Sequence, residues 1–167
     1  VSTTTDRLFE VVNTQTVSGD HSGSDFSGVT TLTLGGATEL PDSTADMPVK
    51  INAQSNVITM YEASINLTGV TIEAAQGITL TNSSSQITMT PAQATAFNTG
   101  TVTLNGGAML VTDGGDLSSE NLSNVTLTLD EATTLPDSNS DLPLSINADS
   151  NAITANNTLN LSSKTVT

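Results

Sequence analysis

The sequence predicts an all-β fold, a right-handed parallel β-solenoid with about 20 residues per coil and seven to eight coils. Three observations support this fold class. A phrase of 20 residues at 40–59 returns at 135–154 with 13 identities. A shorter pattern recurs at intervals near 20 residues, and the composition is rich in Thr, Ser and Asn. These features are typical of coils that stack strand on strand.

The long repeat indicates an internal duplication within one solenoid domain, 1–167. Its first copy reads LPDSTADMPVKINAQSNVIT and its second reads LPDSNSDLPLSINADSNAIT, at an offset of 95 residues. An alternating run of Val, Thr and Leu precedes each copy, and the two runs align with each other when a one-residue gap is allowed. We therefore place the duplicated units at 29–60 and 125–154, inside a domain that is part of a longer array or filament.

The shorter pattern predicts the individual coils. In each, a bulky apolar anchor is followed by two or three small or turn residues and then by a β-branched run. Successive anchors are 21, 20, 30, 25, 20 and 19 residues apart. This period is too long for a hairpin and too short for a strand–helix–strand unit of about 30 or more residues, so it fits one solenoid coil. The anchors are Phe26, Met47, Leu67, Phe97, Leu122, Leu142 and Leu161.

The 30-residue interval contains the strongest helix signal. Thr90 can cap the N-terminus and Pro91 stands at the first helical position, before a run that contains three alanines. We expect one short helical decoration near 91–97. Short strands such as 101–105 and 108–112 are expected after it, with Gly, Asn, Asp and Ser at the corners.

The composition fits this architecture. The chain has 30 Thr, 20 Ser and 15 Asn among 167 residues, and only 12% of its residues are charged. Outward side chains in a solenoid stack on copies of themselves about 4.8 Å away. Hydroxyl and amide groups can hydrogen-bond to such copies, whereas identical charges would repel. The low charged fraction is therefore an expected property of stacked coils.

The charge balance and the hydrophobic pattern each exclude one class of partner. Seventeen acids stand against Arg7, Lys50 and Lys164, which gives a net charge of −14. Nucleic-acid affinity requires clustered basic side chains, so we expect no nucleic-acid partner. No apolar run approaches the roughly 18 residues of a membrane span, so we expect no membrane insertion.

Calcium is the one cofactor that the sequence suggests, because Ca²⁺ takes carboxylate and carbonyl oxygens. Acidic residues occur in pairs at the expected corners, but the glycine-and-aspartate nonapeptide repeat of calcium-loaded solenoids is absent. The alternative is that these residues cap turns through nearby backbone N–H groups. The candidate metal ligands are Asp42, Asp46, Asp113, Asp116, Asp137 and Asp141.

Catalysis and ice binding are weaker interpretations. His21 lies in the segment Ser18–Asp25, but triad residues usually converge from separate rigid elements, so we expect no enzyme and assign no catalytic residue. Six Thr-x-Thr pairs suit an ordered water surface, although irregular coil lengths would break such a rank. The pairs begin at Thr31, Thr79, Thr88, Thr101, Thr126 and Thr165.

Three phrases carry a resemblance to a class of known proteins. They are Leu67–Thr71, Asn124–Leu129, and the run Thr90–Phe97 that leads into Thr101–Leu104. Together with the composition of residues 26–167, they resemble β-solenoid repeats of giant secreted bacterial surface proteins: adhesins, surface-layer proteins and extracellular fibres. The resemblance implies an extracellular or cell-surface location and a structural or adhesive role, for example in a biofilm matrix.

The chain ends suggest how such a module would assemble. Leu159–Thr167 reads as another strand without a cap, and Val1–Val12 carries neither proline nor a persuasive helix. We expect the solenoid to continue in further repeats or to stack end to end with copies of itself.

The expected function is therefore a structural module of an extracellular bacterial filament, adhesin or surface layer, assembled by strand-edge stacking. A surface glycan is a further expected partner. The alternatives are a Ca²⁺-, glycan- or ice-binding solenoid and, less favoured, a carbohydrate-active β-helix enzyme.

Overall fold

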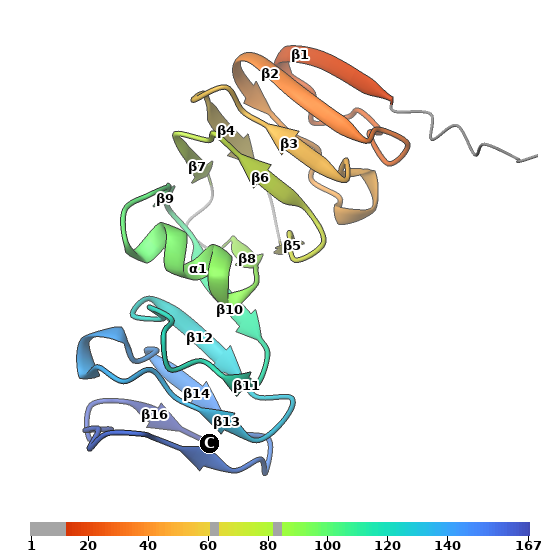
Figure 1. Cartoon of the computed structure of the whole chain (residues 1–167). Coiled ribbons are helices and arrows are strands. Elements are labelled where there is room, and N and C mark those ends of the chain that lie inside the picture. The colour runs from red at the N-terminus through yellow and green to blue at the C-terminus, as the bar shows by residue number, and fades with distance from the viewer. Residues whose placement is uncertain (1–12, 61–63, 82–84) are drawn as a thin grey trace, which may run out of the picture.

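The chain forms a β-solenoid of about seven turns, as the sequence predicts. The structure is a computed structural model that describes residues 13–60, 64–81 and 85–167. All of its paired strands run parallel, and Figure 1 shows the coils stacked from β1 at one end to β16 at the other. Residues 1–12 of the expected domain lie outside the described residues.

Sheet A collects seven strands from the N-terminal part of the chain. The long strand β2 belongs to two ladders, because residues 31–33 pair with β3 and residues 38–39 pair with β4. One ladder continues from β3 to β6, and the other runs from β4 through β7 to β9. The strands are β1 (Thr14–Asp20), β2 (Thr31–Glu39), β3 (Lys50–Asn52), β4 (Val57–Met60), β6 (Thr71–Glu73), β7 (Gly77–Leu80) and β9 (Thr103–Asn105).

Two further sheets complete the solenoid. Sheet B runs in the order β5, β8, β10, β12, β14 and β16, and sheet C in the order β11, β13 and β15. Sheet B therefore contains strands from both halves of the chain. Its strands are β5 (Ser64–Asn66), β8 (Gln86–Thr88), β10 (Ala108–Thr112), β12 (Val125–Thr128), β14 (Ser145–Asn147) and β16 (Thr165–Val166). Those of sheet C are β11 (Gly115–Asp116), β13 (Thr133–Thr134) and β15 (Ile153–Thr154).

The core is a set of apolar rows that run along the stack of coils. In sheet B, Val111, Leu127 and Ile146 are in register on β10, β12 and β14, and each is buried. The flanking residues on each strand point outward, as period-two alternation requires. On β12 and β14 these outward residues are polar, whereas β10 carries Leu110 there. Burial of one thin aliphatic row per strand explains how a chain with 2% aromatic residues forms a core.

The two duplicated units lie in different sheets. In the first unit, β2 and β3 belong to sheet A, whereas the equivalent strands of the second unit, β12 and β14, belong to sheet B. The strand β5 stacks on the 3-10 turn Thr44–Asp46 of the first unit, where Asn66 N–H donates to the Thr44 hydroxyl at 2.9 Å. Sheet B thus begins on a corner of the first unit and ends on the strands of the second.

The short helix is confirmed and spans Pro91–Asn98, one residue beyond the expected end. Thr90 and Gln93 form a capping box at its start, in which each side chain accepts from the other residue's backbone N–H. The helix, α1, lies between the β9 and β8 regions in Figure 1. None of the helices in the described part of the chain is long and apolar enough to cross a membrane.

Polar side chains of α1 replace the ladder bonds that a strand would make. The Gln93 Nε2 group donates to the carbonyl oxygens of Leu67 and Val70, at 3.0 and 3.1 Å. At the other end of the helix, the Asn98 Nδ2 group donates to the Asn121 carbonyl at 2.9 Å. The helix therefore occupies the place of a strand while it stays bonded to the coils on both sides.

Candidate functional site

The duplicated acids lie at corners that are built around 3-10 turns. These turns are Thr44–Asp46 and Asn139–Asp141. The Asp46 carbonyl accepts from Phe26 N–H at 2.8 Å, and the Asp141 carbonyl accepts from Leu122 N–H at the same distance. These two residues thus hold the anchor of the preceding coil through their backbone.

The first residues of the two acid pairs differ in environment. Asp137 is exposed, and its backbone N–H donates to Ser118 O at 3.1 Å. Asp42 is half-buried, and its Oδ1 atom is enclosed without a hydrogen-bond partner among the described residues. The duplication therefore preserves the acids in sequence but gives them different surroundings.

The Asp113–Asp116 corner is a tight turn. Asp113 Oδ1 accepts from Gly114 N–H at 2.8 Å, and Asp116 Oδ1 accepts from Ser118 N–H at 3.0 Å. A side chain at Gly114 would collide with Glu131 and would stand 2.8 Å from Asp130 Oδ1. Asp130 and Glu131 of the next coil therefore lie against this corner. The sequence alone does not indicate this contact.

These acids do not gather into a metal-binding cluster. Within residues 13–60, 64–81 and 85–167, no group of three or more Asp, Glu, His or Cys side chains has the geometry to hold a metal ion. Calcium binding by the six candidate aspartates stays a prediction. The contacts that the structure does show for Asp113 and Asp116 are those of turn caps.

One turn chemistry recurs along the solenoid. At eight corners an Asp or Asn oxygen accepts from the backbone N–H two residues later, which replaces a backbone turn bond. These turn bonds by themselves favour Asp and Asn at the corners. The turn residues are Asp20, Asp25, Asn52, Asn66, Asp116, Asn121, Asn147 and Asn160.

Three of the turn carboxylates have a lowered pKa. For Asp20 the main cause is the backbone N–H of Ser22, and for Asp25 and Asp116 it is the hydroxyl of the serine two residues later. Hydrogen bonds to the charged form favour ionisation. Because the pKa is lower in the folded state than its usual value of 3.8, each turn contributes stability above that pH. The contribution is lost as the pH falls through the lower, folded value.

We predict that Asp116→Asn makes the protein less sensitive to acid. Asparagine keeps an oxygen that can accept from Ser118 N–H but does not titrate. The melting temperature of the variant should fall less than that of the wild type when the pH is lowered from about 5 to 2. Asp137→Asn is the control, because the Asp137 carboxylate receives no hydrogen bond from a described residue. Equal acid sensitivity of Asp116→Asn and wild type would contradict the prediction.

The histidine segment does not form a triad. His21 Nδ1 lies 3.1 Å from the Ser24 hydroxyl, and its ring packs against Phe26 with centroids 5.7 Å apart. The carboxylate of Asp20 instead accepts from the backbone and hydroxyl of Ser22. Among the described residues no carboxylate is hydrogen-bonded to the imidazole, so the structure shows no acid that orients His21 as in a triad.

A hollow of about 360 Å³ lies where α1 meets sheet B. Its walls include Phe97, Leu104, Met109, Asn124 and Leu144. No carboxylate of a described residue lines it, so the described part of the chain places no pair of acids there of the kind that glycoside hydrolysis uses.

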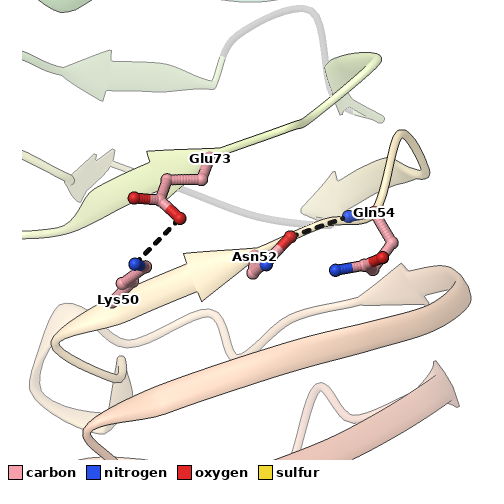
Figure 2. A network of polar contacts seen from close by, with 4 residues as sticks. All are labelled: Lys50, Asn52, Gln54 and Glu73. Atoms are coloured by element: carbon pink, nitrogen blue, oxygen red, sulfur yellow. Dashed lines mark hydrogen bonds and ion pairs between the residues drawn. The ribbon is translucent and has the colours of Figure 1, made fainter.

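Charged side chains on the outer face of sheet A form an ion pair between coils. Figure 2 shows Lys50 on β3 and Glu73 on β6, with Nζ and Oε2 2.8 Å apart. Beside them, Asn52 accepts from the backbone N–H of Gln54 at 3.2 Å. Both side chains of the pair are partly exposed, so the pair contributes about 1 kcal/mol or less to stability.

Asparagines at two equivalent corners tie one coil to the coil before it. The Asn56 Nδ2 group donates to Leu34 O, and the Asn151 Nδ2 group donates to Leu129 O, both at 3.0 Å. The corner before each asparagine contains two residues other than glycine with positive φ, for example Asp149 at 45° and Ser150 at 66°. Both units contain the phrase Ser-Asn-x-Ile-Thr, and this repetition is the feature of the sequence that could have indicated the role of the asparagine.

The outer face of sheet B differs from the other surfaces because none of its strands contains a charged residue. Thr126, Ser145 and Thr165 form one row across β12, β14 and β16. The predicted Thr-x-Thr pairs do not form a single rank, since the pair at Thr31 lies on sheet A and the pair at Thr126 lies on sheet B.

Comparison with known proteins returned no match to any family model, to any curated protein or to any solved structure.

Proposed function

We propose that this chain is a structural module of an extracellular bacterial filament, adhesin or surface layer. Its coils would continue, in the same polypeptide or in a second copy, through pairing at the terminal strand edges. The parallel solenoid supports this proposal, because a further coil can add one strand to the edge of a sheet.

The last coil of sheet B carries the proposal. Leu127, Ile146 and Val166 form one apolar row, in register from β12 to β16. Leu127 and Ile146 are at most 1% exposed, whereas Val166 is 44% exposed. A further coil would cover Val166 as β16 covers Ile146, and it would pair with the open edge of β16. Burial of such a row is the main favourable term in solenoid stacking.

Val166→Asp tests stacking between copies. If terminal edges join, wild-type protein should form longer particles as concentration rises, and the variant should not, because an unpaired carboxylate would be buried at the joint. Sedimentation velocity and electron microscopy measure the particle length. Val49→Asp is the matched control, since Val49 is also exposed, at 59%, but lies on an inner coil. Wild-type particles that stay single at every concentration would contradict stacking between copies.

A further inference from the structure

We propose that the outer face of sheet B binds the same face of a second copy, so that two solenoids pair side by side. We define the sheet-B face by its two outward rows on β10, β12, β14 and β16. They are Leu110, Thr126, Ser145 and Thr165, and Thr112, Thr128 and Asn147, so every member but Leu110 is polar. This lateral contact is separate from end-to-end stacking and does not depend on it.

Charge makes this face the one where two copies can approach. The chain carries a net charge of −14, so copies repel one another in general. The outer surface of sheet A carries Lys50, Glu73 and Glu39, and that of sheet C carries Asp116. Packed sheets lie about 10 Å apart, which is close to the screening length in ordinary salt. Carboxylates on opposed faces would therefore repel strongly, and the sheet-B face has none.

The hydrogen-bonding groups of the sheet-B face are self-complementary. Hydroxyl and amide groups both donate and accept, so the Thr, Ser and Asn side chains of this face can pair with those of a second copy about a two-fold axis. The hydroxyls of Thr112 and Thr128 make no hydrogen bond to another described residue. Asn147 uses Oδ1 to accept from Asp149 N–H, and its amide N–H groups donate to none of the described residues. Strand spacing is the same in both copies, so the rows can match rung by rung.

The border of the face predicts how salt would act. Asp130 and Asp149 are exposed and follow Thr128 and Asn147 by two residues, just beyond the strands. In a pair of copies these acids would lie at the rim of the contact and repel one another. Added salt should screen this repulsion and strengthen the pairing.

A second copy fits this face better than a neutral polysaccharide does. Sugar rings usually stack on aromatic side chains, and none of the strands of sheet B contains an aromatic residue. A copy of the same face supplies both a matching spacing and the absence of charge. Binding of a neutral polysaccharide is therefore the competing result that the experiment can detect.

The duplication supplies a matched pair of variants. Asn147 on β14 and Asn52 on β3 occupy equivalent positions in the repeated phrase, and each accepts from the N–H two residues later. Asn52 lies beside Lys50 and Glu73 on sheet A, as Figure 2 shows, whereas Asn147 lies on the sheet-B face. Substitution by aspartate adds one charge at each place with almost no change in shape, and the oxygen that caps the turn remains.

The experiment measures association by analytical ultracentrifugation in the Val166→Asp chain, a variant chosen to prevent end-to-end stacking. We expect dimers whose association constant rises between about 0.05 and 0.5 M salt. Asn147→Asp should weaken this constant by about tenfold or more, because each copy would bury an unpaired carboxylate. Asn52→Asp should leave it unchanged. Thr128→Asp is a second variant on the same face, and circular dichroism checks that every variant is folded.

Three results would overturn lateral pairing. The first is a monomer at high salt and at every concentration in the Val166→Asp chain. The second is an equal loss of association in Asn52→Asp and Asn147→Asp. The third is a monomer that co-sediments with an insoluble neutral polysaccharide in a manner that Asn147→Asp abolishes, which would assign the face to a glycan. Because end-to-end stacking is tested by the length of wild-type particles, its failure would be seen separately.

Discussion

Replacement of Leu127 by alanine is expected to lower the free energy of unfolding by about 2–5 kcal/mol. Leu127 has no exposed surface and lies between Val111 and Ile146 in the core row of sheet B. A cavity at this position removes contacts with the coils on both sides. Since stability in a solenoid depends on interfaces between neighbouring coils, the loss should be felt along sheet B. Denaturant unfolding followed by circular dichroism measures the effect.

Thr128→Ala is the control for this substitution. Thr128 is the next residue on the same strand, points outward and makes no side-chain hydrogen bond within the described part of the chain. Its replacement should cost less than about 1 kcal/mol, mainly through lower strand propensity. Hydrogen exchange in β10 and β14 would show whether the Leu127 cavity loosens the adjacent coils. Similar costs for the two variants would mean that the core row does not stabilise the stack.

Asn151→Ala should lower the free energy of unfolding by about 1–3 kcal/mol, and Asn56→Ala by a similar amount. Each asparagine donates to a carbonyl of the preceding coil, Leu129 O for Asn151 and Leu34 O for Asn56. Without the amide, that partly buried oxygen loses its donor. Thermal and denaturant unfolding of the two single variants and of the double variant measure the cost.

Two comparisons test the physical reason. Asn151→Asp removes the donor but keeps the shape, so it should be at least as harmful as Asn151→Ala at neutral pH. Asn157→Ala should have little effect, because Asn157 is exposed and its side chain makes no hydrogen bond to a described residue. If Asn151→Ala and Asn157→Ala unfold alike, the bond between coils does not contribute to stability.

The features that could be predicted are those with a local or periodic signal. The Thr90 cap and Pro91 placed α1 to within one residue, because capping depends on adjacent residues only. The strand Ala108–Thr112 agrees with its predicted range, because a short apolar run bounded by turn residues is a local signal. The Asx turn at Asp116 matches the turn-capping alternative for the acidic candidates, because that bond is also local.

The features that could not be predicted depend on contacts between coils. The approach of Asp130 and Glu131 to Gly114 joins residues about one coil apart, and nothing near Gly114 in the sequence indicates it. A local feature also could not be predicted: the Asp20 carboxylate accepts from Ser22 and not from the adjacent His21, which depends on side-chain directions at one corner. The Thr-x-Thr pairs could be counted in advance, but their distribution over different sheets could not.

The sequence by itself determined that this chain builds parallel coils of about 20 residues, with one short helix and polar corners. Those properties follow from hydrophobic period, turn chemistry and repetition. Only the tertiary structure decided that the two copies of the repeated phrase lie in different sheets, and that sheet B presents an uncharged face. The physical reason is that the total length of the preceding corners decides which sheet a strand joins. The coils around α1 are longer than the rest, so equal phrases reach different sides of the solenoid.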